Sequence, residues 1–174
     1  ENIQLRRRRP ALRTAKVCLK VVSAVIKWRN IMANEMRIKT TVVCLPIHNL
    51  DKTLAFYQNA LGFSDAQVDE GMITLELPNL SLFLMEKDAF ETYSKKAGRG
   101  AQFPDKNTGV VISCAMESQK AVDTILEKAP KYGGAVPTKA AVDETYGGYT
   151  GYFLDPNGHL WELVWNPQRA VQDQ

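Results

Sequence analysis

The pattern of hydrophobic and polar positions becomes regular after residue 40. An apolar run rich in β-branched residues covers 41–45 and predicts a strand that Pro46 ends. Asn49 or Asp51 is placed to cap a helix that runs to about residue 61 and stops at Gly62. Three short strands are predicted after this helix, over residues 65–69, 72–77 and 81–86.

The same order of elements returns in the second half of the chain. Residues 110–116 form another apolar strand, and Ser118 can cap a helix that stops before Gly133. Three strands are again predicted, over residues 135–142, 149–154 and 159–164. The order βαβββ thus occurs twice, with a period of roughly 70 residues. It predicts an α+β fold: two tandem βαβββ modules forming a cupped, mostly antiparallel sheet with helices on the outer face.

These boundaries divide the chain into a main domain and two flanking segments. The domain covers residues 36–168, with module one at 38–90, a linker at 91–108 and module two at 109–166. Residues 169–174 form a C-terminal tail, and residues 1–35 form an N-terminal arm. A face of each half-sheet remains for a small-molecule pocket once the other face packs on its helix.

The N-terminal arm is basic and has the periodicity of an amphipathic helix. Such a helix is typical of a membrane-surface or targeting segment, and its charge also suits nucleic acid. The third interpretation is that the arm is accessory or not native, because Met36 stands just before the first strand as an alternative start. We favour the accessory interpretation and assign the arm no function.

The charge of the chain is divided between the arm and the domain. Residues 1–40 hold 11 Lys and Arg against two Asp and Glu, whereas residues 41–174 hold 11 against 17. The net charge of +3 therefore hides an acidic domain, which suits a cationic ligand and disfavours nucleic acid. Three cysteines without paired spacing predict a reducing, cytoplasmic location. The domain has no apolar stretch long enough to span a bilayer, and no nucleotide-binding or hydrolase motif occurs.

Two segments resemble the vicinal-oxygen-chelate superfamily, which includes glyoxalases, bleomycin-resistance proteins and extradiol dioxygenases. Residues 50–63 look like the first helix of that superfamily, and residues 147–163 are similar to its closing hairpin. The resemblance covers about residues 38–167 and implies the paired-module fold and a homodimer. It implies no single reaction, because the superfamily contains lyases, epimerases, dioxygenases and drug-binding proteins.

The resemblance also implies where a metal ion would bind. Metal-using members place four His, Gln or Glu ligands on the cavity face, and the matching positions here are Val42, Phe83, Val111 and Glu162. Only Glu162 can act as a ligand, whereas a divalent metal needs about three protein donors. We therefore expect no metal and no other cofactor.

Strand alternation predicts which side chains line the cavity. The predicted ligand-binding residues are Cys44, His48, Thr74, Glu76, Phe83, Met85, Ser113, Tyr149, Tyr152 and Glu162. His48 is placed at the rim, and Tyr149 and Tyr152 lie in a glycine-rich stretch whose aromatic rings could stack on a planar ligand. For Tyr146 and Tyr149, ordinary hairpin packing is the slightly favoured alternative. His159 is predicted to face away from Glu162.

Two functional hypotheses follow from this cavity. The first is a metal-free binding protein that sequesters an aromatic or cationic small molecule, as bleomycin-resistance proteins do. The second is a glyoxalase-like lyase or isomerase, or a dioxygenase-like enzyme, in which Glu162 acts as the catalytic base or as a metal ligand. A strand carboxylate that pairs with a nearby Lys or faces water is the remaining interpretation of Glu162.

Overall fold

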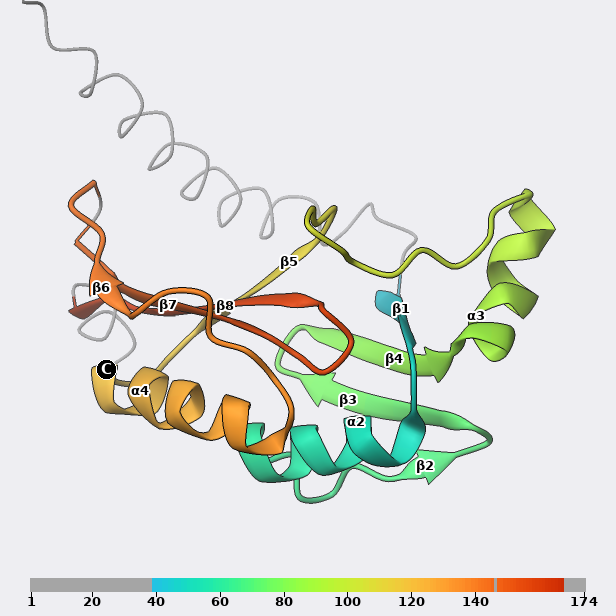
Figure 1. Ribbon diagram of the computed structural model, residues 1–174, viewed down its shortest axis with the longest axis horizontal. Helices are drawn as coiled ribbons and strands as arrows, with labels where there is room; N and C mark the ends of the chain where they lie inside the picture. Colours follow the sequence, from blue (N-terminus) through green and yellow to red (C-terminus); the bar gives the residue numbers. More distant parts are fainter. Residues whose placement is uncertain (1–38, 146, 168–174) are drawn as a thin grey trace, which may run out of the picture. The chain divides into compact units, whose positions relative to one another are not determined.

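The computed structural model describes residues 39–145 and 147–167 of the chain (Figure 1). The predictions for the basic arm, for Tyr146 and for the tail at 169–174 lie outside these residues. No helix among the described residues has the length and apolar character needed to cross a membrane.

Module one contains one mixed four-stranded sheet and one main helix. Its elements are β1 (Val42–Ile47), α2 (Leu50–Phe56), the π-helical turn η1 (Tyr57–Leu61), β2 (Val68–Asp69), β3 (Met72–Leu77) and β4 (Leu80–Glu86). The strand order is β1-β4-β3-β2. β1 pairs with β4 in parallel, and the other two pairs are antiparallel.

Module two repeats this arrangement. Its elements are β5 (Val111–Ala115), α4 (Gln119–Lys128), the 3-10 turn η3 (Ala129–Tyr132), β6 (Ala141–Val142), β7 (Tyr149–Leu154) and β8 (Leu160–Trp165). The order β5-β8-β7-β6 has the same single parallel pair, between β5 and β8. The predicted tandem βαβββ modules are confirmed, and they form two four-stranded sheets, each with mostly antiparallel pairing.

Both main helices begin and end at the residues that the sequence indicated. Asn49 accepts a hydrogen bond from the Lys52 backbone N–H (2.9 Å), and Ser118 accepts one from Ala121 (3.1 Å). Gly62 adopts a left-handed conformation with φ of 84° after η1. A residue with a Cβ is disfavoured there, so the helix ends.

Four segments differ from the prediction. β1 does not end at Pro46 but continues through it to Ile47, which is tolerated because β1 lies at the edge of its sheet. The linker predicted at 91–108 is not a plain loop, because α3 (Lys87–Ser94) and the 3-10 turn η2 (Lys95–Ala97) occupy its first part. The strands predicted at 65–69 and 135–142 are each only two residues long, as β2 and β6. Both are edge strands, so pairing on one side alone holds them in place.

The helices α2 and α4 cover one face of the sheets (Figure 1). The strand side chains on this face are buried, as the alternation of the strands requires. They are Leu75, Leu82, Leu84, Ile112, Phe153, Trp161 and Leu163. These residues join Phe56, Tyr57 and Val122 of the helical layer in one core that includes both modules. We call the opposite face of the two sheets the cup face.

A buried polar network joins the two modules at the β7–β8 turn. The carboxylate of Asp155 is 3% exposed, and it accepts hydrogen bonds from the hydroxyl of Tyr57 (2.7 Å) and from the backbone N–H groups of Asn157 (2.8 Å) and His159 (2.9 Å). Burial, followed by the nearby Asp155 charge, raises the pKa of Tyr57 well above its ordinary value. The phenol therefore stays protonated and remains a donor to Asp155.

Further bonds attach this turn to the start of α2. The amide of Asn157 donates to the hydroxyl of Thr53 (3.1 Å) and accepts from the backbone N–H of His48 (2.8 Å). The His159 ring nitrogen Nε2 lies 2.8 Å from the carbonyl oxygen of Pro46. Because every one of these groups has a partner, the closing turn of module two is fixed against module one without an unsatisfied buried group.

Candidate functional site

Glu162 is the centre of a hydrogen-bonded cluster on the cup face of module two. The hydroxyl of Ser113 donates to Glu162 Oε2 at 2.5 Å, and the hydroxyl of Tyr152 donates to Glu162 Oε1 at 2.7 Å. The two donors come from the strands on either side of β8, so each carboxylate oxygen is held from one side. The carboxylate is therefore fixed in orientation by its own sheet.

The strand register explains why these three residues meet. Glu162 of β8 is directly paired with Ser113 of β5 in the parallel ladder and with Tyr152 of β7 in the antiparallel ladder. Residues opposite one another in a sheet project to the same face, with Cβ atoms about 5 Å apart. Ser113, Glu162 and Tyr152 therefore form one row across three strands, which we call the polar row.

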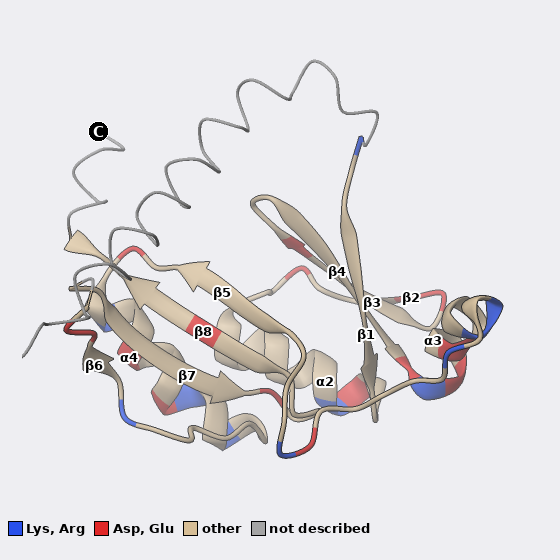
Figure 2. Cartoon of the chain, turned by 90° about the horizontal axis from the view of Figure 1, so that it is seen from above, with Lys and Arg blue, Asp and Glu red and all other residues tan. Residues whose placement is uncertain are grey.

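The surroundings of the polar row on the cup face are mostly apolar. Thr150, two residues from Tyr152 on the same face of β7, is polar but buried. Leu160 and Val164 lie on either side of Glu162 along β8, and their partners on β5 are Val111 and Ala115. The side chain of Val111 is 49% exposed. Figure 2 shows that charged residues gather mainly on helices and loops, whereas the strands carry few of them.

Within the part of the chain that the structure describes, Glu162 also has no basic partner. Across residues 39–145 and 147–167, no Lys, Arg or His nitrogen lies within salt-bridge distance of its carboxylate, and the pair found is Glu91 with Lys95. A carboxylate held by two hydroxyl groups on an apolar face can bind a cation or a hydrogen-bond donor from outside.

Module one has a different row at the corresponding place. Cys44 of β1 is paired with Phe83 of β4, which is paired with Thr74 of β3. All three are partly buried, and burial raises the pKa of the Cys44 thiol above its ordinary value. This neutral row, as we call it, offers an aromatic wall and no charge.

The remaining predicted residues of module one lie near the neutral row but differ in accessibility. Glu76 is exposed and accepts a hydrogen bond from the Ser81 hydroxyl at 2.6 Å. Met85 is only 2% exposed. α3 begins two residues after Met85 and packs against β1 and β4. A ligand cannot reach Met85 in this conformation, so the structure does not place it on an open cavity wall.

Three further residues lie away from the polar row. Tyr149 donates from its hydroxyl to Asp123 of α4 at 2.6 Å, so it lies on the helix side of β7. His48 is exposed after β1, and its ring stacks on Phe103 with centroids 4.0 Å apart. His159 is buried against Pro46, as part of the module junction. Among the described residues, no hydrogen bond or ion pair joins either imidazole to Glu162, and His159 faces away from it as expected.

The positions that bind metal in the resembled superfamily do not fit a divalent ion here. Val42 and Val111 are 37% and 49% exposed, and neither they nor Phe83 carries a nitrogen or oxygen donor in the side chain. Only Glu162 could coordinate, and one carboxylate is too few. Within the described residues, no group of three or more His, Cys, Asp or Glu side chains could hold an ion.

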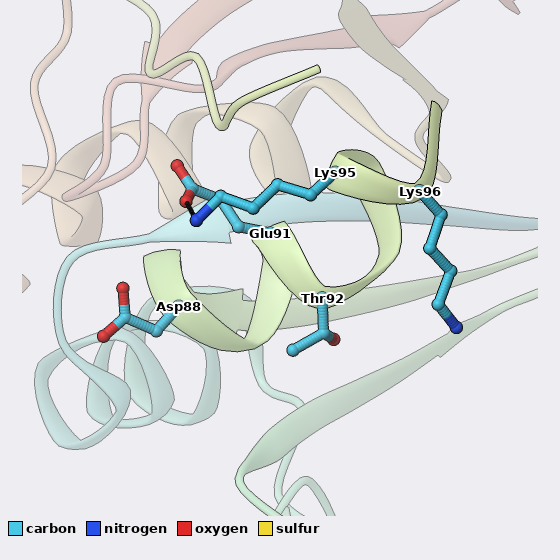
Figure 3. Close-up of a pocket in the computed structure, with 5 residues that line it drawn as sticks. All are labelled: Asp88, Glu91, Thr92, Lys95 and Lys96. Carbon is cyan, nitrogen blue, oxygen red and sulfur yellow. Dashed lines mark ion pairs between the residues drawn. The ribbon is translucent and has the colours of Figure 1, made fainter. Parts of the chain in front are cut away.

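Two surface hollows lie outside the polar row. One, of about 430 Å³, is on α3 and is lined by Asp88, Glu91, Thr92, Lys95 and Lys96. Figure 3 shows Glu91 and Lys95 joined as an ion pair on this helix. The second, of about 420 Å³, lies between η1 and the start of α4, on the helix side of the sheets. Glu162 lines neither hollow, so its cluster is an open feature of the sheet surface.

The network around Asp155 and Asn157 was not predicted from the sequence. Both residues lie in the segment that resembles the closing hairpin, and their side chains bond groups about 100 positions away in module one. The available signal was the Asx residues themselves, because Asp and Asn in a turn bond nearby backbone groups. The presence of Asp and Asn in a turn does not show which groups of the other module they bond to.

Solved structures with the same fold include a hypothetical protein from S. aureus, with 24% identity and a TM-score of 0.65 over 78% of this chain and 99% of the other. A glyoxalase-related enzyme from Fulvimarina pelagi has 21% identity and a TM-score of 0.62, over 74% and 88%. The fosfomycin resistance protein FosX from Mesorhizobium loti has 13% identity and a TM-score of 0.51, over 79% and 98%. No family model and no curated protein matches the sequence.

These similarities establish the fold. The chain has the paired-module fold of the glyoxalase, bleomycin-resistance and dioxygenase proteins, as its two motif segments indicated. At these identities the fold is shared, while the reaction or ligand depends on the side chains of the cup face.

Proposed function

We propose that this protein binds a small organic cation with an apolar or aromatic body on the cup face, and that it does so without a metal ion. One observation carries the proposal: the carboxylate of Glu162, oriented by Ser113 and Tyr152, has no basic partner in the described part of the chain and stands among apolar side chains. A cation supplies the missing charge, and its apolar body covers the exposed valines.

The excess of acidic residues in the domain also favours a positively charged ligand. Residues 41–174 carry 17 acidic and 11 basic residues, so the domain attracts cations at a distance as well as at Glu162. The aromatic ring of Phe83 in the neutral row and that of Tyr152 in the polar row offer flat apolar surface. Sequestration requires only affinity, so it is compatible with a site that has a single charged group.

The experiment compares three ligands built on one aromatic scaffold. Benzyltrimethylammonium, benzyl alcohol and phenylacetate are titrated into the protein by calorimetry at low ionic strength, with and without EDTA. We expect the cation to bind more tightly than the alcohol, phenylacetate to bind most weakly, and EDTA to change nothing. The Glu162→Gln variant should lose the preference for the cation, whereas Glu127→Gln, which removes an exposed carboxylate on α4, should keep it. Equal binding of the three ligands, or binding abolished by EDTA, would overturn the proposal.

A glyoxalase-like isomerase or lyase is the second candidate. The observation that favours it is the same cluster, because a carboxylate beside two hydroxyl groups can move protons on a bound substrate. Its test is exchange of the α-proton of hydroxyacetone for deuterium, followed by NMR. Exchange that Glu162→Gln abolishes would support the enzyme, and no exchange above buffer would exclude this role for Glu162.

A further inference from the structure

The hydrogen-bond pattern of the polar row constrains the ligand more narrowly than charge alone. Ser113 and Tyr152 each carry a single hydroxyl proton, and both protons point to Glu162. The donors of the polar row are therefore committed to its own carboxylate. What Glu162 and Ser113 offer to a ligand is lone pairs.

The side chains next to the polar row add no accessible hydrogen-bond donor to it. The side chains beside Glu162 and Ser113 on the cup face, Leu160, Val164, Val111 and Ala115, carry no donor and no acceptor. On β7 the neighbours of Tyr152 on this face are Leu154 and Thr150, and Thr150 is buried at 7% exposed. A ligand group that needs a hydrogen-bond donor, such as a carboxylate or a phosphate, finds no accessible one in these side chains. A cation without N–H groups gains the charge attraction and leaves the carboxylate lone pairs unpaired.

The hydrogen bonds from Ser113 and Tyr152 leave both oxygens of the Glu162 carboxylate able to accept a further hydrogen bond. Ser113 holds Oε2 from β5 and Tyr152 holds Oε1 from β7, so one lone pair on each oxygen is used from opposite sides. The remaining lone pairs suit two parallel N–H donors in one plane, which is the fork of an amidinium or guanidinium group. A fork of this kind satisfies both oxygens at once.

We infer that the cup face recognises a planar amidinium or guanidinium group, through a bidentate contact with Glu162 that Ser113 and Tyr152 orient. This inference rests on the proposed binding of an organic cation and specifies its head group. Ser113 and Tyr152 act here as positioning residues, because they set the direction of the carboxylate and need not touch the ligand.

The test uses benzamidine and benzyltrimethylammonium, two aromatic cations of equal charge that differ in their N–H groups. We expect benzamidine to bind about tenfold more tightly, or better, because two charge-assisted hydrogen bonds are added. Similar dissociation constants for the two probes would overturn the inference while leaving the proposed function intact. Failure of both probes to bind in a Glu162-dependent way would instead reject the proposed function.

Two variants separate orientation from folding. Tyr152→Phe keeps the charge of Glu162 and removes one of its two holding bonds, so the preference for benzamidine over benzyltrimethylammonium should fall severalfold while the quaternary probe binds as before. Glu127→Gln is the charge-matched control, because Glu127 is exposed on α4, on the helix side of the sheets. A Tyr152→Phe protein with wild-type melting temperature and an unchanged preference would refute the positioning role.

Discussion

The two modules share one strand order but place different chemistry on the cup face. Module one presents Cys44, Phe83 and Thr74 in a row across three strands, and module two presents Ser113, Glu162 and Tyr152. The backbone register that aligns each row is the same, with a parallel outer pair and an antiparallel inner pair. A repeat of the fold therefore does not repeat the site.

The closing turns of the two modules also differ, because the turn of module two is the more buried and the more extensively hydrogen-bonded. In module one, Pro78 and Asn79 form an exposed turn between β3 and β4. In module two, Asp155, Asn157 and His159 are buried and bond to module one. Module two thus supplies both the charged group of the site and the polar groups of the junction. Module one offers apolar surface to the candidate site and supplies hydrogen-bonding partners to the junction.

The largest expected effect is at the closing turn of module two. Replacing Asp155 with Ala leaves the Tyr57 hydroxyl and two backbone N–H groups without their acceptor in a buried place. We expect the free energy of unfolding to fall by about 3–5 kcal/mol, measured by urea denaturation. The control Pro78→Ala, in the exposed turn of module one, should change it by at most about 1 kcal/mol. Equal losses would remove the distinction between the two turns.

The second largest expected effect is the stability lost on substituting the glycines that follow the two main helices. A Cβ on Gly134 would lie 2.7 Å from both the Leu154 carbonyl oxygen and Phe56 Cε2, whereas one on Gly62 would meet nothing within 4 Å. We expect Gly134→Ala to cost about 1–3 kcal/mol through overpacking. At Gly62 the cost, about 1 kcal/mol, comes from the left-handed backbone instead.

Asparagine distinguishes these two causes. It tolerates the left-handed region, so Gly62→Asn should recover most of the stability lost in Gly62→Ala. Gly134→Asn should be worse than Gly134→Ala, because its side chain is larger in the same space. Recovery at Gly134 would show that space does not explain the need for glycine there.

The contact between Tyr57 of module one and Asp155 of module two predicts a dependence of stability on alkaline pH. Burial and the Asp155 charge raise the pKa of Tyr57 in the folded state above its unfolded value, which is about 10. The resulting stabilisation is complete below pH 10. It is lost as the pH rises further, by up to about 1.4 kcal/mol per pH unit.

Urea titrations of the wild type and of Tyr57→Phe between pH 8 and pH 11 measure this effect. The wild type should lose stability above pH 10 more steeply than the variant. Tyr149→Phe serves as the control, because Tyr149 bonds to Asp123 of its own module in a more accessible place. Identical slopes for the wild type and Tyr57→Phe would contradict the prediction.

The smallest effect concerns the two described cysteines. Burial raises the thiol pKa of both Cys44 and Cys114, so both should react slowly with iodoacetamide at neutral pH. Cys44 lies on the cup face, whereas Cys114 packs against the core beside Leu163. Peptide mapping should find Cys44 alkylated first in the native protein and equal rates in urea. Faster labelling of Cys114 would place the neutral row on the wrong face.

The sequence predicts the strands with strong alternation well and the edges poorly. The predicted bounds 72–77 and 149–154 are those of β3 and β7. β2 and β6 are shorter than predicted because an edge strand ends where its one neighbour stops pairing, which depends on tertiary contacts. α3 was missed because its buried side includes Glu91, a charged residue that masks the apolar periodicity.

For the candidate site, too, the local pattern of the sequence predicts some features, whereas features that depend on long-range pairing are not predicted. Alternation along single strands was enough to place Ser113, Tyr152 and Glu162 on one face. It could not show that they bond to one another, because the register between strands is set by long-range pairing. Tyr149 was assigned to the cavity only through the glycine-rich stretch, and its odd spacing from Tyr152 puts it on the helix side.

The junction network has a consequence for the covalent path between the modules. Its bonds join residues 98 to 113 positions apart, and the shared core includes side chains from both modules. The segment from Gly98 to Thr108 adds the stacking of Phe103 on His48, but it is not needed to hold the two modules together. A chain nicked near Lys106 should remain one particle in native electrophoresis, and the two halves, produced separately, should reassemble by complementation.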